Sequence, residues 1–322
     1  MTAAISAHRG GTEGAPEGTY EAYRAAPGTG AEYVEFDIRR TADAQLVAYH
    51  EPGTDGGQAI ADISYARLCE LAGYEVPLVS DVMRLIAGKA FGHLDLKEAG
   101  GEDVIIEQAL EILGPGNFVA TTLEDASVAA IKNRFPDVAV ALSLGRDLGK
   151  MPWPMLLSAR RQELFPLSRI RACGADWVAM HYRLARAGVL RQCHRAGIAA
   201  MIWTVNDDEA IARWLADPRV GVVVTDRPRH AVALRDRLRD TALCQPLLSS
   251  RSCAPWSAIV CSGFPPPPLS SWTTKVRCFS GVARIPEAGP CRAASSTRPS
   301  NQPMLLSASA SRKPESSPSR RR

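Results

Sequence analysis

The sequence of 322 residues contains eight cysteines but no CxxC pair, so it carries no signal for a zinc site or a redox dithiol. It also lacks any apolar run of about 18 residues, which excludes a helix that spans a membrane. No glycine-rich dinucleotide-binding loop is present. Because a candidate site residue, His8, follows the amino terminus at once, no room is left for a signal peptide, and a cytoplasmic protein is expected.

Acidic residues are scarce after residue 240. Residues 241–322 contain 11 lysines and arginines but only 2 acidic residues, whereas residues 1–240 contain 27 basic and 32 acidic residues. The body of the chain is therefore mildly acidic, although the formal net charge of the whole chain is +4. A nucleic-acid-binding domain would place a basic face on its folded part, so no nucleic-acid partner is expected.

The carboxyl-terminal segment is also poor in the patterns that build a core. It contains 17 serines and 12 prolines, and its apolar residues follow neither the helical nor the strand period. Such a segment cannot bury enough apolar surface to offset the loss of chain entropy, so residues 241–322 are predicted to be a disordered tail. A solvated appendage is the favoured interpretation. A segment that binds acidic lipid or nucleic acid, and a reading-frame artefact, stay open.

Before this tail, short apolar runs alternate with amphipathic stretches. The predicted strands cover residues 5–7, 33–38, 91–96, 118–121, 138–142, 177–180, 198–203 and 221–225. The predicted helices cover residues 19–26, 78–87, 103–113, 126–134, 184–196 and 208–215. Eight buried strands that alternate with helices over about 235 residues are typical of a (β/α)8 TIM barrel, here residues 1–240. A further apolar run, residues 46–49, is interpreted as a hairpin outside the barrel.

Two carboxylates on one predicted strand indicate a metal site. Glu35 and Asp37 are two residues apart, so their side chains leave the strand on the same face. Such a pair repels unless a cation lies between its members, and hard oxygen ligands suit Mg²⁺ or Ca²⁺. Asp95, at the end of the next barrel strand, is the predicted third ligand. An isolated pair of strand-end acids would more simply be solvated, but other reactive side chains at neighbouring strand ends favour the metal site.

These neighbours are two histidines and two cationic side chains. His8 and His50 are the predicted acid–base pair, because an imidazole with an ordinary pKa of about 6.5 can give or take a proton near neutrality. Arg9 and Lys97 would hold an anionic group and stabilise negative charge in the transition state. Three further histidines have no such partners in the sequence and are interpreted as structural, namely His181, His194 and His230.

Seven motifs then share their order and spacing with one enzyme family. They are Ala7-His8-Arg9-Gly10, Ala15-Pro16-Glu17-Gly18-Thr19, the stretch from Gly30 to Asp37, the set Thr41, Asp43, Leu46, Val47 and His50, and then His93-Leu94-Asp95-Leu96-Lys97, Trp203-Thr204-Val205-Asn206 and Thr225-Asp226-Arg227-Pro228. From Ile5 to Pro228 the chain resembles the glycerophosphodiester phosphodiesterase family. The resemblance implies a TIM-barrel hydrolase that uses a divalent metal to cleave glycerophosphodiesters into glycerol 3-phosphate and an alcohol.

Further roles follow from the resemblance with alternatives left open. Glu17 either binds Arg9 or a metal-bound water, or caps a helix that starts near Thr19. Trp203 is interpreted as a wall for the glycerol carbons rather than as core, whereas Asn206 and Asp226 are interpreted as turn and cap residues.

The chain departs from the family at three positions. Gly18 replaces the usual asparagine, Glu51 replaces an aspartate, and Asp95 replaces the commoner glutamate, which withdraws that carboxylate by one methylene.

The sequence also leaves parts of the reaction open. The attacking group is either the glycerol hydroxyl of the substrate, which gives a cyclic phosphate, or water. A lysophospholipase D activity and a catalytically silent barrel that binds phosphoesters are the alternative functions. The alcohol of the substrate, the choice between Mg²⁺ and Ca²⁺, and the oligomeric state are not determined.

Overall fold

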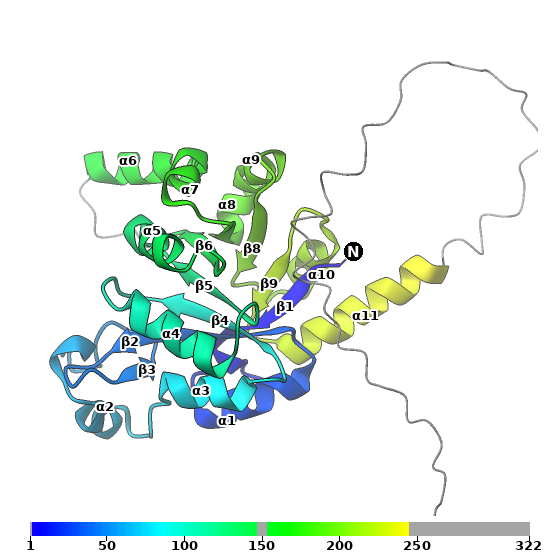
Figure 1. The fold of residues 1–322 in the computed structure, drawn as a ribbon. Coiled ribbons are helices and arrows are strands. Elements are labelled where there is room, and N and C mark those ends of the chain that lie inside the picture. The colour runs from blue at the N-terminus through cyan, green and yellow to red at the C-terminus, as the bar shows by residue number, and fades with distance from the viewer. Residues whose placement is uncertain (1, 147–152, 245–322) are drawn as a thin grey trace, which may run out of the picture. The chain divides into compact units, whose positions relative to one another are not determined.

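A computed structural model describes residues 2–146 and 153–244 of the chain (Figure 1). The predicted tail therefore lies outside the described residues, apart from its first four positions. The strands of the described part form a single sheet. They are β1 (Ala4–Ala7), β2 (Tyr33–Arg40), β3 (Leu46–Ala48), β4 (Phe91–Leu96), β5 (Phe118–Thr122), β6 (Ala139–Leu144), β7 (Trp177–His181), β8 (Ala199–Trp203) and β9 (Val222–Thr225).

This sheet closes into a barrel. Its strand order is β1-β9-β8-β7-β6-β5-β4-β2-β3, and a further pairing joins β1 to β2. Every pairing is parallel except that of β3, which runs antiparallel to β2. Eight parallel strands therefore form the closed barrel, and β3 lies outside it. This confirms the predicted (β/α)8 TIM barrel and the hairpin beside it.

Helices connect the barrel strands and cover them (Figure 1). They are α1 (Tyr20–Ala25), α2 (Tyr65–Ala72), α3 (Val79–Ile86), α4 (Glu102–Ile112), α5 (Asp125–Arg134), α6 (Trp153–Leu164), α7 (Leu167–Cys173), α8 (Tyr182–Arg186), α9 (Val189–Arg195), α10 (Asp208–Ala216) and α11 (Pro228–Cys244), with 3-10 turns η1 (His8–Gly10), η2 (Ala26–Thr29) and η3 (Ile60–Asp62). None of these helices is long and apolar enough to cross a bilayer.

The helix predictions needed two kinds of correction. The single helix predicted over residues 184–196 is interrupted at Gly188, which has a φ of 100° and separates α8 from α9. Such a left-handed conformation is open to glycine at little cost but cannot continue a helix. Four helices were not predicted at all: α2, α6, α7 and α11. In α6, Met155 and Leu157 are exposed, so its apolar residues do not mark one buried face.

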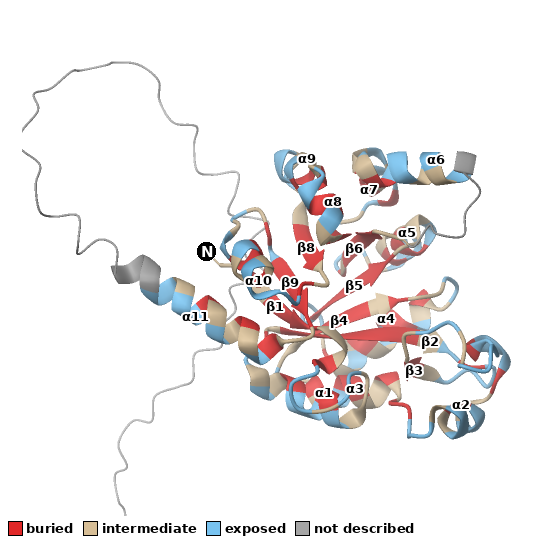
Figure 2. Cartoon of the chain, turned by 180° about the vertical axis from the view of Figure 1, so that it is seen from behind, coloured by how far each residue is buried: buried red, intermediate tan, exposed pale blue. Residues whose placement is uncertain are grey.

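Successive side chains along each barrel strand point alternately outward and inward, which divides the core into two layers. On β2, Val34, Phe36 and Ile38 face the surrounding helices and are fully or almost fully buried. Inward-facing apolar residues close the floor of the barrel, and they are Tyr33, Val119, Ala141, Ala179, Met201 and Val222. Figure 2 shows the barrel strands buried and the outer helices with both buried and exposed positions. The inward positions nearer the carboxyl ends of the strands are therefore free to carry polar side chains.

The hairpin after β2 has a small core of its own. Val47 packs with Ile60, Ile63, Leu68 and Val76, which come from the segment between β3 and α3. Because β3 runs antiparallel to β2, the chain that leaves it passes beside Asp37, whose carbonyl accepts a hydrogen bond of 3.1 Å from Tyr49 N. His50 lies in that segment, two residues after β3.

Helix α11 is tied to the start of the barrel. Arg235 is buried, and its Nη1 lies 2.6 and 2.8 Å from the two carboxylate oxygens of Glu32. Glu32 also accepts a hydrogen bond of 2.9 Å from the backbone of Ile5 on β1. Since α11 continues to Cys244, it crosses the domain boundary predicted at residue 240, and that boundary stays a prediction.

A truncation tests which part of the chain is needed for folding. Removal of residues 245–322 should leave a cooperative thermal unfolding transition, because α11 and its contact with Glu32 are kept. Removal of residues 229–322 should lower the transition by several degrees or abolish it, since Arg235 and the apolar face of α11 are lost. Circular dichroism melting curves of both truncated proteins measure this. Aggregation of the protein that ends at residue 244 would show that the tail belongs to the fold.

Candidate active site

A cavity of about 330 Å³ opens at the carboxyl ends of the barrel strands. Parallel barrels place their chemistry at this end, because the strand-end loops converge there. The cavity is lined by all the predicted catalytic, metal-binding and substrate-binding residues, namely His8, Arg9, Glu35, Asp37, His50, Asp95, Lys97 and Trp203. Residues that are distant in the sequence thus gather around one pocket.

The first wall of the pocket is a strained turn after β1. Arg9 has a φ of 48° and a ψ of 36°, a left-handed conformation that costs a non-glycine residue about 1–3 kcal/mol. Contacts on both sides offset this cost. The Arg9 N–H donates to Glu35 Oε2 at 2.8 Å, and its carbonyl accepts from Gly18 N at 2.9 Å. Gly10 follows with a φ of 82°, and a Cβ there would lie 2.9 Å from the backbone of Ala22, so only glycine fits.

Three carboxylates form the centre of the pocket. Glu35 and Asp37 on β2 are almost completely buried, and Asp37 lies opposite Asp95 in the register between β2 and β4. One oxygen from each of Glu35, Asp37 and Asp95 lies within 4.8 Å of the others. Three hard anionic oxygens at such separations match the ligands that Mg²⁺ and Ca²⁺ prefer. These three residues could therefore hold one metal ion.

Two cationic side chains neutralise part of this charge. Asp37 Oδ2 lies 2.9 Å from Arg9 Nε, and Asp37 Oδ1 lies 2.8 Å from Lys97 Nζ. Lys97 also contacts Asp95. Burial alone would raise the pKa of Asp37, but Lys97 and Arg9 outweigh it and hold the pKa below its ordinary value. Glu35 is less well compensated, since burial and the charge of Asp37 raise its pKa to about 8.

Glu17 supports the turn from outside. Its Oε1 lies 2.7 Å from Arg9 Nη1. The helix cap is supplied by Thr19, whose hydroxyl accepts from the backbone of Ala22 at 3.2 Å. Of the two roles left open for Glu17, the contact with Arg9 is the one present in the structure.

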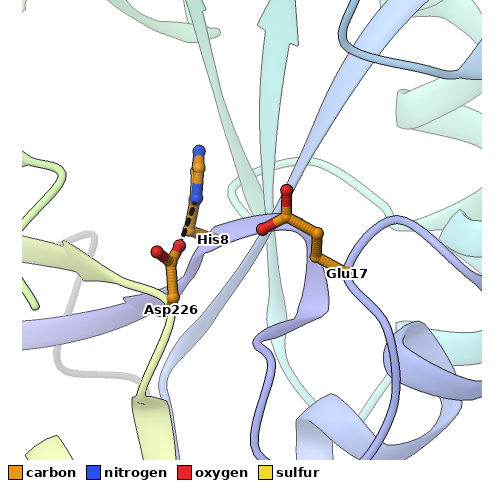
Figure 3. Close-up of side chains that lie close together, drawn as sticks. All are labelled: His8, Glu17 and Asp226. Carbon is orange, nitrogen blue, oxygen red and sulfur yellow. Dashed lines mark hydrogen bonds and ion pairs between the residues drawn. The ribbon is translucent and has the colours of Figure 1, made fainter.

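His8, which follows β1, is held by side chains at the ends of the neighbouring strands β9 and β8. Its Nδ1 lies 2.5 Å from Asp226 Oδ1 (Figure 3). Asn206 donates to the other oxygen of the same carboxylate. Burial would lower the pKa of His8, but the charge of Glu35 and the hydrogen bond with Asp226 outweigh it and raise that pKa. His8, Glu17 and Asp226 also offer three ligand atoms within 4.8 Å, but Arg9 and Asn206 already engage the two carboxylates.

His50 faces the pocket from the loop after β3. Its Nδ1 lies 2.7 Å from Glu51 Oε1, and its carbonyl accepts from Arg39 Nε at 2.9 Å. The imidazole is 39% exposed, whereas that of His8 is 17% exposed. Glu51, which replaces the aspartate usual in the family that the sequence resembles, thus keeps a carboxylate beside this histidine.

The wall formed by β5 to β9 is mostly uncharged. Trp203 lies there, with its ring 5.3 Å from that of His181 in an edge-on arrangement. Gly145 permits this packing, since a Cβ on it would lie 2.8 Å from His181 and 3.2 Å from Trp203. Arg146 is a cation of this wall, and its Nη2 pairs with Glu124 at 2.7 Å.

Comparison with known proteins identifies the family. Residues 8–230 match the model of the glycerophosphoryl diester phosphodiesterase family. The chain belongs to this family. It is therefore an enzyme, a phosphoric diester hydrolase. This agrees with the resemblance noted in the sequence, and the matched residues cover the whole pocket.

Relatives of this phosphodiesterase chain extend over its barrel. It is 24% identical over 256 residues to the glycerophosphodiester phosphodiesterase of Caldanaerobacter subterraneus, with 73% of this chain and 98% of the relative covered. A glycerophosphodiester phosphodiesterase structure from Parabacteroides distasonis superposes with a TM-score of 0.59 at 20% identity, covering 74% of this chain and 98% of the other. A phosphodiesterase from Oleispira antarctica, solved with the product sn-glycerol-3-phosphate, gives a TM-score of 0.57 at 19% identity, with 73% and 97% covered.

Sequence reasoning missed three pocket features of this phosphodiesterase. Asp226 was interpreted as a turn or cap residue, yet it contacts His8 across 218 positions of sequence. Its position at the end of β9 was the available signal, because every barrel strand ends at the same face. His93 and Arg146 also line the pocket and were not singled out. Burial lowers the pKa of His93 to about 4, so this imidazole is neutral at physiological pH.

The contact between His8 and Asp226 predicts a change in the pKa of the imidazole. Asp226→Asn removes the charge and the carboxylate acceptor but keeps the burial of His8, which disfavours the protonated form. The pKa of His8 should therefore fall, and its protonated form should disappear at a lower pH than in the wild type. An NMR pH titration of the His8 ring measures this. Asp207→Asn, which alters the cap of α10 on the neighbouring loop, should leave the value unchanged, and an unchanged value in Asp226→Asn would contradict the interaction.

Proposed function

We propose that this chain hydrolyses glycerophosphodiesters to glycerol 3-phosphate and an alcohol, with one divalent cation and a pair of histidines. The observation that carries the proposal is the convergence of Glu35, Asp37 and Asp95 with His8 and His50 on one pocket. A phosphodiester hydrolase needs a site for the anionic phosphate, a base for the attacking oxygen and an acid for the leaving oxygen. This pocket offers side chains for each requirement.

The carboxylates would hold the cation, either Mg²⁺ or Ca²⁺, between β2 and β4. When bound, the cation supplies positive charge to the phosphate oxygens and stabilises the charge that develops on them. Arg9 and Lys97 would add N–H donors from either side of Asp37. Since both already pair with Asp37, their positions are fixed before a substrate arrives, and such preorganised donors cost little reorganisation during the reaction.

The two histidines would move the protons through their Nε2 atoms. Nδ1 of His8 lies against Asp226 and Nδ1 of His50 lies against Glu51, which leaves the second nitrogen of each ring for a substrate. A carboxylate on Nδ1 fixes the tautomer and orientation of an imidazole and stabilises its protonated form. One histidine would take the proton of the attacking oxygen, and the other would protonate the leaving alkoxide. Attack by the glycerol hydroxyl and attack by water both fit this arrangement.

The neutral wall is suited to the carbon part of the substrate. Trp203 lines it and offers a face for the glycerol carbons or for the alcohol. Support for glycerol 3-phosphate as product comes from the Oleispira antarctica phosphodiesterase, which was solved with that compound. A catalytically silent barrel is disfavoured, because both histidines, all three carboxylates and both cations are present. No contact in the described residues specifically favours a lysophospholipase D.

Removal of divalent cations should abolish turnover. Without a cation the pKa of Glu35 stays raised, and the three carboxylates lack the positive charge that binds a phosphate. After treatment with excess EDTA, release of glycerol 3-phosphate from a panel of glycerophosphodiesters should stop, and Mg²⁺ or Ca²⁺ should restore it. Glu35→Gln should not recover at the same cation concentration, whereas Asp103→Asn on the outer helix α4 should. Full activity of the cation-free protein would refute the metal proposal.

Loss of either histidine should lower the rate without unfolding the barrel. His8→Ala and His50→Ala should each reduce kcat by about 10²–10⁴-fold, the usual contribution of acid–base catalysis. His194→Ala is the matched control, because this histidine lies exposed on α9, away from the pocket. Steady-state kinetics together with melting curves measure both effects. A variant that is folded and keeps nearly the wild-type kcat would remove that histidine from the mechanism.

A further inference from the structure

Three polar side chains lie deep in the barrel, and the proposed function does not use them. Ser6 on β1, His93 on β4 and Thr121 on β5 are almost completely buried. The floor just beneath them is apolar, since its inward residues are Tyr33, Val119, Ala141, Ala179, Met201 and Val222. Burying polar groups costs free energy unless each finds a hydrogen-bond partner. The burial of these three polar side chains therefore needs an explanation.

The three side chains form one chain of hydrogen bonds that ends on Asp95. Ser6 Oγ lies 3.0 Å from His93 Nδ1, and His93 Nε2 lies 3.3 Å from Thr121 Oγ1. Thr121 Oγ1 in turn lies 2.5 Å from Asp95 Oδ1. The strand register brings these groups together, because Asp95 pairs with Thr121 between β4 and β5. The chain thus runs from the first strand to one of the three clustered carboxylates.

The direction of each hydrogen bond follows from the number of protons available. A hydroxyl has a single proton, and Thr121 must donate it to the carboxylate, which only accepts. Toward His93, Thr121 can then only accept, so His93 Nε2 must carry a proton. Nδ1 accepts from Ser6 when the ring is neutral. Because Nε2 carries a proton in the neutral tautomer described and in the protonated ring alike, the donation toward Asp95 does not depend on the charge of His93.

These hydrogen bonds act on Asp95, the one of the three carboxylates for which the described residues show no contact with Arg9. Glu35 and Asp37 share one strand, and Arg9 contacts both through its backbone and its side chain. Asp95 stands on another strand, and Lys97 pulls its Oδ2 toward Asp37. Thr121 holds the other oxygen, Oδ1, toward β5. The contacts with Lys97 and Thr121 together fix the plane of the Asp95 carboxylate.

We infer that His93 is a positioning residue for the cation site: through Thr121 it holds Asp95 in the orientation that completes the carboxylate set with Glu35 and Asp37. The inference rests on the proposed function, because it assumes that these carboxylates bind a divalent cation. It gives the row of buried polar groups a purpose that packing alone would not. Partners that orient metal ligands typically change metal affinity by about 10–100-fold when they are removed.

Cation affinity, measured on the full chain without substrate, is the first test. Isothermal titration calorimetry with Mg²⁺ and with Ca²⁺ should show His93→Leu and Thr121→Val each binding about 10–100-fold more weakly than the wild type. The double variant should bind the cation no more weakly than the weaker-binding single variant, because both substitutions interrupt the same series of hydrogen bonds. His93→Gln, whose amide can still donate to Thr121, should recover much of the affinity. Ser143→Ala removes a buried hydroxyl of the same pocket that makes no described contact with Asp95, and this variant should bind as the wild type.

The outcomes separate the inference from the proposed function. If the wild type binds neither ion, the metal proposal itself fails, and the inference fails with it. If the wild type binds and the folded His93→Leu and Thr121→Val variants bind equally well, the cation site stands and the role of His93 is refuted. Additive losses in the double variant would also refute it, since they would mean that the two residues act separately.

A measurement on the wild type covers the case in which the variants do not fold. ¹⁵N NMR of the histidine rings reports which nitrogen of His93 carries the proton. Protonation at Nε2 with an unprotonated Nδ1 supports the hydrogen-bond direction toward Asp95. A neutral ring with its proton on Nδ1 would refute it, because Nε2 could not then donate to Thr121.

Discussion

The double ion pair of Asp37 is the interaction on which the rest of the pocket depends. This carboxylate is almost completely buried at the end of β2, where Arg9 Nε lies 2.9 Å from one oxygen and Lys97 Nζ lies 2.8 Å from the other. A buried charge left without its partner costs about 3–5 kcal/mol, so each of the three residues constrains the other two. The turn after β1, the end of β2 and the end of β4 are thereby fixed to one another, and the strained backbone of Arg9 follows from this constraint. The guanidinium can reach Asp37 while its own N–H reaches Glu35 only if the chain turns sharply at that residue.

Much of this arrangement could be predicted from the sequence, because the barrel converts strand order into spatial order. Each barrel strand is a short apolar run, and the polar residues at the carboxyl ends of β1, β2 and β4 were predicted to be site residues. Because β2 pairs with β4 in a parallel register, Asp37 and Asp95 lie opposite one another. The helix predictions failed where the local apolar pattern of a segment does not match the burial or backbone conformation of its residues in the fold. The apolar residues of α6 do not mark one face, and Gly188 divides a stretch whose pattern reads as a single helix.

The side-chain contacts could not be predicted for a different reason. The hydrogen bond between His8 and Asp226 joins β1 to β9 at the seam of the barrel, and nothing in the sequence near either residue encodes the other. The same holds for His93, which reads as an ordinary inward residue of β4 until its neighbours Ser6 and Thr121 are placed. These contacts depend on strand register and on rotamers, whereas strand order alone decides which residues reach the pocket. The sequence therefore identifies the reactive groups more readily than the groups that orient them.

The distribution of charge also assigns different tasks to the two halves of the barrel mouth. The carboxylates and their cations lie on β1, β2 and β4, whereas β5 to β9 contribute mostly neutral side chains and one arginine, Arg146, that is already paired with Glu124. A glycerophosphodiester has a comparable asymmetry, since its phosphoryl group is anionic and its glycerol arm is neutral. Under the proposed function the charged half would bind and cleave the phosphoryl group, and the neutral half around Trp203 would contact an ester arm. Changes in the loops after β5 to β8 should then alter which alcohol is accepted while leaving the chemistry intact, because no carboxylate of the cation site or acid–base histidine lies on them.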